Sequence, residues 1–143
     1  MKAVIQRVQG AKLWAEGIEV SEIGRGLVIY FGVERGDNFS NAAYFAKKIA
    51  NLRIFEDCDG KMNFSALQYG YEILAVSQFT LCGDCTRGNR PCFTNAELPV
   101  LAKDIYNRFC EALAAQGVIV KKGVFGANMK IEQTNDGPVT IIL

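Results

Sequence analysis

Two continuous apolar runs constrain the fold of this chain more than any other feature of its sequence. Residues 26–33 (GLVIYFGV) are apolar throughout, and residues 71–81 (YEILAVSQFTL) contain the apolar stretch 73–76. Short continuous runs of this kind are typical of strands that are buried on both faces. We therefore expect two buried strands in the interior of the protein.

Two other segments have the periodicity of a helix. Within residues 37–55, one helical face is apolar, and it consists of Ala42, Phe45, Ala46, Ile49 and Ala50. A second apolar stripe consists of Leu98, Leu101, Ile105, Phe109 and Leu113. The expected end signals are Ser40 as N-cap of the first helix and, for the second, a Thr94/Glu97 capping box, Pro99 in the first turn and Gly117 at the end.

The rest of the chain predicts short strands and turns. The alternating start predicts one strand, residues 11–24 predict a hairpin that turns near Glu16 and Gly17, and Asp59-Gly60 marks another turn. Three short strands are expected at residues 118–125, 129–135 and 139–143. About seven strands and two main helices in uneven order indicate a single compact α+β domain over residues 1–143, with mostly antiparallel β-sheets.

The composition excludes several classes of chemistry. Histidine is absent, which excludes Ser-His and Cys-His dyads and His-ligated zinc, so protons must move through another group, a water or the substrate. The net charge of +1 excludes a strongly basic nucleic-acid coat but allows a local patch over a few phosphates. Without a signal peptide or an apolar run of roughly 20 residues, we expect a cytoplasmic protein with reduced cysteines and no membrane contact.

The segment SQFTL at the end of the second buried run is the first candidate for chemistry. Ser77, Gln78 and Thr80 offer hydroxyls and an amide, and backbone N–H groups there are suited to hold an oxyanion. The alternative is a polar strand end that satisfies its own backbone, because hydroxyls are common at such positions.

The loop that follows contains Cys82-x-x-Cys85 and Cys92. This spacing fits a redox pair or half of a zinc site, but Cys58 and Cys110 are distant in sequence and no fourth ligand is apparent. The basic residues Arg87, Arg90, Lys121 and Lys122 fit either phosphate contacts or an ordinary solvated surface.

Near the C-terminus, the dipeptide Gly137-Pro138 precedes a strand-like stretch. A turn into an edge strand accounts for it without any function, since proline is confined to such places in sheets. The alternative is a rigid backbone device that contacts a substrate.

Taken together, five segments carry a resemblance to a known family. AVIQRV, KIANLRIFEDCDGKMNFS, VSQFTL, FGANMKIE and NDGPVT occur in this order, and the whole chain resembles the D-aminoacyl-tRNA deacylases, also called D-tyrosyl-tRNA deacylases. The resemblance implies a cytosolic homodimer with β/β/α layers that needs no cofactor or metal. It also implies hydrolysis of the ester between a D-amino acid, or glycine, and the 3′ end of tRNA, in active sites at the subunit interface.

The resemblance also assigns roles to individual residues. Residues 77–80 (Ser77, Gln78, Phe79 and Thr80) line the reaction site, Gly137 and Pro138 form a cis peptide that enters the partner's pocket, and Arg7 braces this pair. Carbonyls of the Gly-Pro turn would exclude an L side chain by clash, and this explains acceptance of many D-amino acids and of glycine. The three cysteines in the loop after SQFTL depart from the family pattern.

Without histidine, Thr80 lacks the usual base for a nucleophile, so we expect a water to attack the ester with help from the ribose 2′-OH. Thr80 as a covalent nucleophile is the mechanistic alternative. The alternatives to a hydrolase are a non-catalytic module that binds RNA ends and a cysteine-based redox or metal protein.

Overall fold

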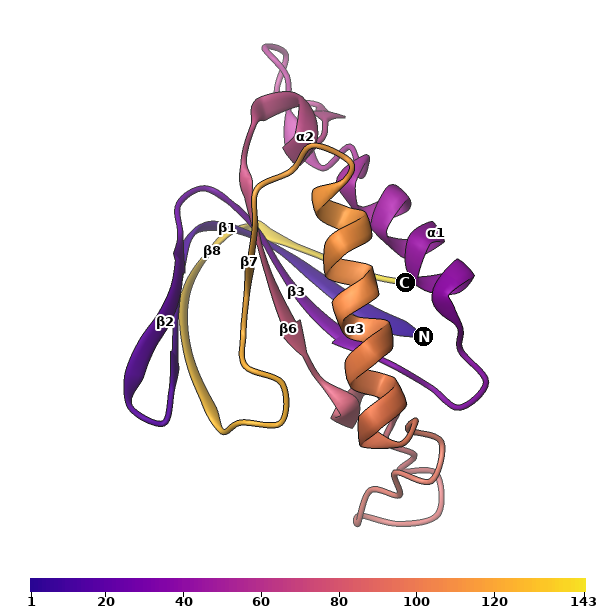
Figure 1. Cartoon of the computed structure of the whole chain (residues 1–143). Coiled ribbons are helices and arrows are strands. Elements are labelled where there is room, and N and C mark those ends of the chain that lie inside the picture. The colour runs from indigo at the N-terminus through magenta and orange to yellow at the C-terminus, as the bar shows by residue number, and fades with distance from the viewer.

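The computed structural model describes all residues, 1–143, and is built around one curled six-stranded sheet (Figure 1). Its strands follow the order β2-β1-β3-β6-β7, and β8 pairs with β1. The bounds are β1 Lys2–Ala15, β2 Ile18–Ile23, β3 Gly26–Gly32, β6 Glu72–Ser77, β7 Val120–Lys122 and β8 Met129–Ile142. The β3–β6 and β6–β7 pairs are parallel and the other pairs are antiparallel, so the sheet is mixed.

The two sides of this sheet bury two separate apolar clusters. In β3, Leu27 and Ile29 belong to the larger cluster, whereas Val28 belongs to the smaller one. This alternation is what a strand buried on both faces requires, and it confirms the expectation for residues 26–33. The Ser21 hydroxyl donates to the carbonyl of Lys122 at 2.7 Å, which ties together β2 and β7, the two end strands of the curled sheet.

Helices α1 (Phe39–Ala50) and α3 (Pro99–Ala114) cover the face with the larger cluster (Figure 1). The rings of Phe31 on β3 and Phe109 on α3 stack at 4.0 Å. The remaining elements are the short helix α2 (Ala66–Tyr69), the one-turn helix η1 (Phe79–Cys82) and the ribbon of β4 (Phe55–Glu56) and β5 (Met62–Phe64). The predicted α+β class with two main helices is confirmed, and no helix is long and apolar enough to cross a membrane.

Both predicted helix starts are wrong in detail. The N-cap of α1 is Asn38, whose side chain accepts from the N–H groups of Ser40 and Asn41, so Ser40 lies inside the helix. Helix α3 begins at Pro99 without any side-chain cap, which overturns the capping box proposed for Thr94. Leu98 and Leu101, expected in the buried stripe, are exposed, whereas Ile105, Phe109 and Leu113 are buried as predicted.

The C-terminal strands also differ from the prediction. The segments 129–135 and 139–143 form one strand, β8, which remains paired with β1 on both sides of Pro138. Gln6 pairs with Thr140 and Val8 pairs with Asn135, so the single residue Arg7 faces four residues of β8. A bulge accommodates a proline in a sheet because the extra residues leave the ladder. We call these four residues, 136–139, the bulge.

Candidate active site

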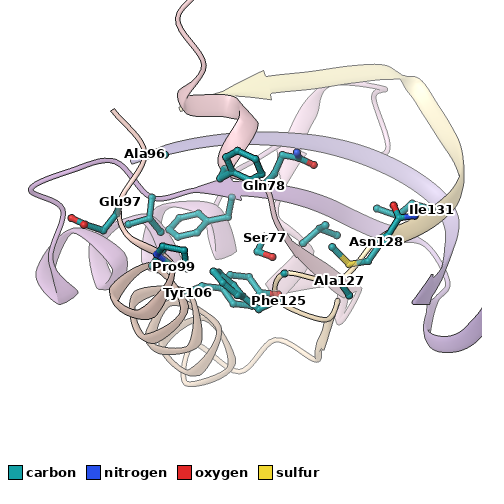
Figure 2. Close-up of a pocket in the computed structure, with 17 residues that line it drawn as sticks. Ser77, Gln78, Ala96, Glu97, Pro99, Tyr106, Phe125, Ala127, Asn128 and Ile131 are labelled. Carbon is teal, nitrogen blue, oxygen red and sulfur yellow. The ribbon is translucent and has the colours of Figure 1, made fainter. Parts of the chain in front are cut away.

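A pocket of about 490 Å³ opens where β6 ends, between the start of α3 and residues 125–129 (Figure 2). Most of its walls are apolar. They consist of Phe31, Val33, Val76, Phe79, Ala96, Pro99, Ala102, Tyr106, Phe125, Gly126, Ala127, Met129 and Ile131, with Ser77, Gln78, Glu97 and Asn128 as the polar lining. A mostly apolar cavity of this size with a few polar groups is typical of sites for small molecules and cofactors.

Three of the four residues predicted from SQFTL line this pocket. Ser77 is the last residue of β6, and Gln78 and Phe79 lead into η1, where the strand predicted to run to residue 81 ends instead. Phe79 is 58% exposed. Thr80 is exposed and lies outside the lining, and its hydroxyl oxygen accepts a hydrogen bond from the Gln78 side-chain amide.

A glycine on β3 makes room for this turn. A Cβ added at Gly32 would lie 2.9 Å from the carbonyl oxygen of Gln78 and 3.3 Å from the Cys82 sulfur. The backbone of η1 therefore packs directly on β3. No side chain caps the N-terminus of η1, so its first N–H groups are available to a polar atom of a ligand.

The pocket offers little acid-base chemistry. Glu97 is the only carboxylate in its lining, and this carboxylate accepts from the backbone N–H of Leu98 at 2.7 Å. Burial raises the pKa of Tyr106 well above its ordinary value, and its phenol donates to the carbonyl of Ala75 at 2.9 Å. Neither group is a free base beside Thr80. The arrangement therefore supplies apolar surface and backbone dipoles, and it gives the Thr80 hydroxyl no proton acceptor of its own.

The remaining predicted residues form a second region at the bulge. Arg7 is buried, and its guanidinium donates to the Ile54 carbonyl at 2.7 Å and pairs with the Asp136 carboxylate at 3.2 Å. A Cβ added at Gly137 would lie 3.4 Å from Arg7 Nη2, so the arginine lies against this glycine. Gly137 and Pro138 are exposed, and the peptide bond between them is cis.

Asp136 links this region to a second arginine. Its carboxylate also pairs with Arg25 at 3.2 Å, and this hydrogen bond raises the pKa of Arg25. The Arg25 guanidinium lies 5.7 Å from the ring centroid of Tyr71.

Within one chain, the pocket and the bulge lie apart. Arg7 pairs with Leu27 on β3, and Leu27 pairs with Ile73 on β6. Ser77 lies four residues further along β6, roughly 13 Å at the rise of an extended strand. None of Arg7, Gly137 and Pro138 lines the pocket. The structure thus brings Ser77, Gln78 and Phe79 together in one place and holds Arg7 and Gly137-Pro138 in another.

The cysteine loop does not present paired thiols. Cys82 is buried, its thiol donates to the Val33 carbonyl at 3.5 Å, and burial raises its pKa. Cys85 and Cys92 are exposed, and all five cysteines are free. A hydrogen bond with Thr94 lowers the pKa of Cys92. No group of three His, Cys, Asp or Glu side chains is placed to hold a metal ion.

Sequence reasoning did not place several residues of the pocket wall in the active site. Tyr106, Glu97 and residues 125–129 come from two segments far from SQFTL in sequence. For residues 125–129, the only signal in the sequence was the segment FGANMKIE, which is part of the family resemblance.

Fold and pocket together define an α+β protein with a mostly apolar pocket at the end of β6, and comparisons with known proteins identify the family. The model of the family "D-Tyr-tRNA(Tyr) deacylase" matches residues 4–143. D-aminoacyl-tRNA deacylases of Geobacillus sp. and Geobacter sulfurreducens are 51% and 50% identical over 143 residues, covering 100% of this chain and 94% of each relative. That of Carboxydothermus hydrogenoformans is 49% identical, covering 100% and 99%. The chain therefore belongs to the D-Tyr-tRNA(Tyr) deacylase family.

Two solved structures have the same fold as this chain. The "c-Myc DNA Unwinding Element Binding Protein" superposes with a TM-score of 0.93 at 42% identity, covering 100% of this chain and 97% of that chain. A probable eukaryotic D-amino acid tRNA deacylase superposes with a TM-score of 0.85 at 19% identity, covering 99% and 97%, and shows that the fold is shared.

Proposed function

We propose that this protein is a hydrolase that cleaves the ester of D-aminoacyl-tRNA in the cytoplasm and releases the D-amino acid and free tRNA. The observation that carries this proposal is the match of the family along nearly the whole chain, with Ser77, Gln78 and Phe79 lining a mostly apolar pocket. The terminal adenosine occupies the apolar pocket, and its ester lies at the start of η1.

The chemistry rests on backbone dipoles and water. As the tetrahedral intermediate forms, the N–H groups of Phe79 and Thr80 stabilise its oxyanion, since no side chain caps them. A water attacks the ester carbonyl, oriented by the ribose 2′-OH of the substrate. Thr80 is a weak nucleophile because its hydroxyl contacts the Gln78 amide, which is no base.

The active site is completed by a second copy of the chain. The pocket has no group that distinguishes the two configurations of an amino acid, while Gly137 and Pro138 are exposed away from it. In the homodimer, the bulge of one subunit reaches the pocket of its partner. Arg7 and Asp136 hold the bulge in a fixed position through contacts that do not involve the substrate.

Chiral selection then follows from exclusion. Backbone carbonyls of Gly137 and Pro138 occupy the space that an L side chain would need, and a D side chain points away from them. The enzyme accepts many D-amino acids because it does not bind the side chain. Glycine has no side chain to clash, so glycyl-tRNA is also hydrolysed.

The test is the hydrolysis of purified D-tyrosyl-tRNA, glycyl-tRNA and L-tyrosyl-tRNA under identical conditions. We expect cleavage of the first two and at least a hundredfold slower cleavage of the third, which corresponds to about 2.7 kcal/mol. A non-catalytic module for RNA ends would protect the D-ester from spontaneous hydrolysis, and that result would overturn the proposal.

A further inference from the structure

A second cavity, of about 470 Å³, adjoins the pocket at the turn between β1 and β2. It is lined by Trp14, Glu16, Gly17, Asn128 and Lys130, and we call it the Trp14 cavity. Asn128 lines both cavities, and Figure 2 shows it at the opposite end of the pocket from Pro99. Trp14 and Lys130 face the side of β1 and β8 opposite to Leu13 and Ile131, so a chain that leaves the pocket past Asn128 reaches the Trp14 cavity around the end of the sheet.

The lining of the Trp14 cavity differs in chemistry from that of the pocket. Trp14 on β1 and Lys130 on β8 are paired across the two strands, and the Lys130 ammonium lies 5.2 Å from the centroid of the indole ring. Lys130 is 71% exposed and also contacts Glu132. The cavity thus combines one aromatic face, one accessible cation, and the polar groups of Asn128 and Glu16.

We propose that the Trp14 cavity binds the nucleotide that precedes the terminal adenosine of the tRNA. This inference rests on the proposed function, which places that adenosine in the pocket. Single-stranded nucleic acids bind by stacking of bases on aromatic side chains and by contacts of cations with phosphates. Trp14 provides the aromatic surface for stacking. The Lys130 ammonium lies over the indole ring, and it contacts the phosphate that joins the two nucleotides when the base displaces it from the ring.

Base chemistry fits the rest of the lining. Every mature tRNA ends in cytidine followed by the terminal adenosine, so the preceding base carries an exocyclic amine. Carboxylate and amide oxygens accept hydrogen bonds from such an amine, and Glu16 and Asn128 supply one of each. The carboxylates of Glu16 and Glu132 weaken the attraction to the phosphate, so stacking on Trp14 carries most of the affinity.

The experiment compares two substrates that differ by one nucleotide. One is 3′-O-D-tyrosyl-adenosine, and the other is the same ester on the dinucleotide cytidylyl-adenosine. For the wild-type protein we expect the dinucleotide ester to have a KM about tenfold lower at similar kcat. Trp14→Ala should remove this advantage and leave hydrolysis of the adenosine ester unchanged, whereas Trp14→Phe should keep most of it.

Lys130→Ala provides a second arm that does not alter the partly buried indole. It should raise the KM of the dinucleotide ester severalfold and make it less dependent on salt, whereas the matched control Lys103→Ala on α3 should not. If the wild type hydrolyses both esters with equal KM, or if Trp14→Ala and Lys130→Ala weaken both esters equally, the inference is wrong and the proposed function stands. If the wild type hydrolyses neither ester although it cleaves D-tyrosyl-tRNA, the inference is wrong, and if it also leaves D-tyrosyl-tRNA intact, the proposed function itself fails.

Discussion

The pocket and the bulge are built in opposite ways. The pocket is open, mostly apolar, and has one carboxylate in its lining. The bulge does not line the pocket of its own chain, and it is held by a buried arginine that also reaches the Ile54 carbonyl and by an aspartate shared between two arginines. The first region has surface to bind a ligand, and the second has a rigid backbone with nothing in its own chain to act on.

This difference indicates a division of labour between two chains. A binding pocket needs an open cavity, whereas steric exclusion of the wrong ligand needs a rigid backbone. Because the two regions lie apart in one chain, a site that uses both must join two subunits. The predictions below disturb one region at a time, and they run from the largest expected effect to the smallest.

Arg7→Ala should have the largest effect, because it leaves the Ile54 carbonyl without its donor and leaves Asp136 with only the exposed Arg25 as its partner. Removal of one member of a buried ion pair costs about 3–5 kcal/mol. We expect urea denaturation to show that the free energy of unfolding falls by about this amount. The rate of D-tyrosyl-tRNA hydrolysis should fall as well. The control is Arg25→Ala, since Arg25 pairs with the same carboxylate but is 56% exposed. Equal losses in the two variants would show that Arg7 does not brace the bulge.

Gly137→Ala should disturb the bulge without touching the pocket of its own chain. The added Cβ would lie 2.8 Å from Val139 Cγ2, at a φ of +122° that side chains rarely adopt. We expect D-tyrosyl-tRNA hydrolysis to fall by about a hundredfold, with a lower ratio of D to L rates, while a non-hydrolysable adenosine analogue still binds. Gly24→Ala, which meets nothing within 4 Å, is the control. An unchanged D-to-L ratio in a folded Gly137→Ala variant would place chiral selection elsewhere.

Thr80→Ala should have a smaller effect, because it keeps the backbone N–H groups of η1. We expect a loss below about a hundredfold, whereas removal of a true nucleophile costs many thousandfold. The complementary substrate is a D-aminoacyl-tRNA that ends in 2′-deoxyadenosine, which should be cleaved slowly. Full activity on it, together with an inactive Thr80→Ala variant, would restore Thr80 as the nucleophile.

The double variant Cys85→Ser/Cys92→Ser should have the smallest effect. Both thiols are exposed and lie outside the lining of the pocket. We expect deacylation within about twofold of wild type, because surface substitutions away from a site are usually neutral. A loss beyond a hundredfold in a folded protein would give the loop a part in catalysis.

Much of this fold could be predicted because local patterns decide it. The uniform apolar runs indicated β3 and most of β6, and helical periodicity indicated α1 and α3. Helix starts were harder, since Ser40 and Asn38 are both good caps and only the geometry of the chain selects Asn38. The strand β8 was divided wrongly, because proline usually interrupts a strand, and here a bulge in the pairing with β1 accommodates it.

The candidate site could be predicted only in part, because many of its residues come together through tertiary packing and not through a local sequence pattern. The segment SQFTL could be identified because its polar residues lie at the end of an apolar strand. The opposite wall, residues 125–129 and Tyr106, contains mostly apolar side chains whose position depends on how α3 and β8 pack. The contacts of Arg7 with Ile54 and Asp136 join residues far apart in sequence, and no local pattern reports them.

The most direct test of a site shared between two chains is subunit complementation. One variant, Gly137→Ala, has a disturbed bulge, and the other, Ala127→Trp, has a blocked pocket. Each is expected to be nearly inactive alone. The two are co-expressed with different affinity tags, purified through both tags, and assayed for hydrolysis of D-tyrosyl-tRNA.

The mixed dimer combines an intact pocket from one subunit with an intact bulge from the other at one of its two sites. The doubly purified mixed dimer should therefore recover about half of the wild-type activity, and an unselected equal mixture about a quarter. If each chain formed its active site alone, both sites of the mixed dimer would carry a defect. Activity that stays at the level of the single variants in a folded mixed dimer would contradict the shared site.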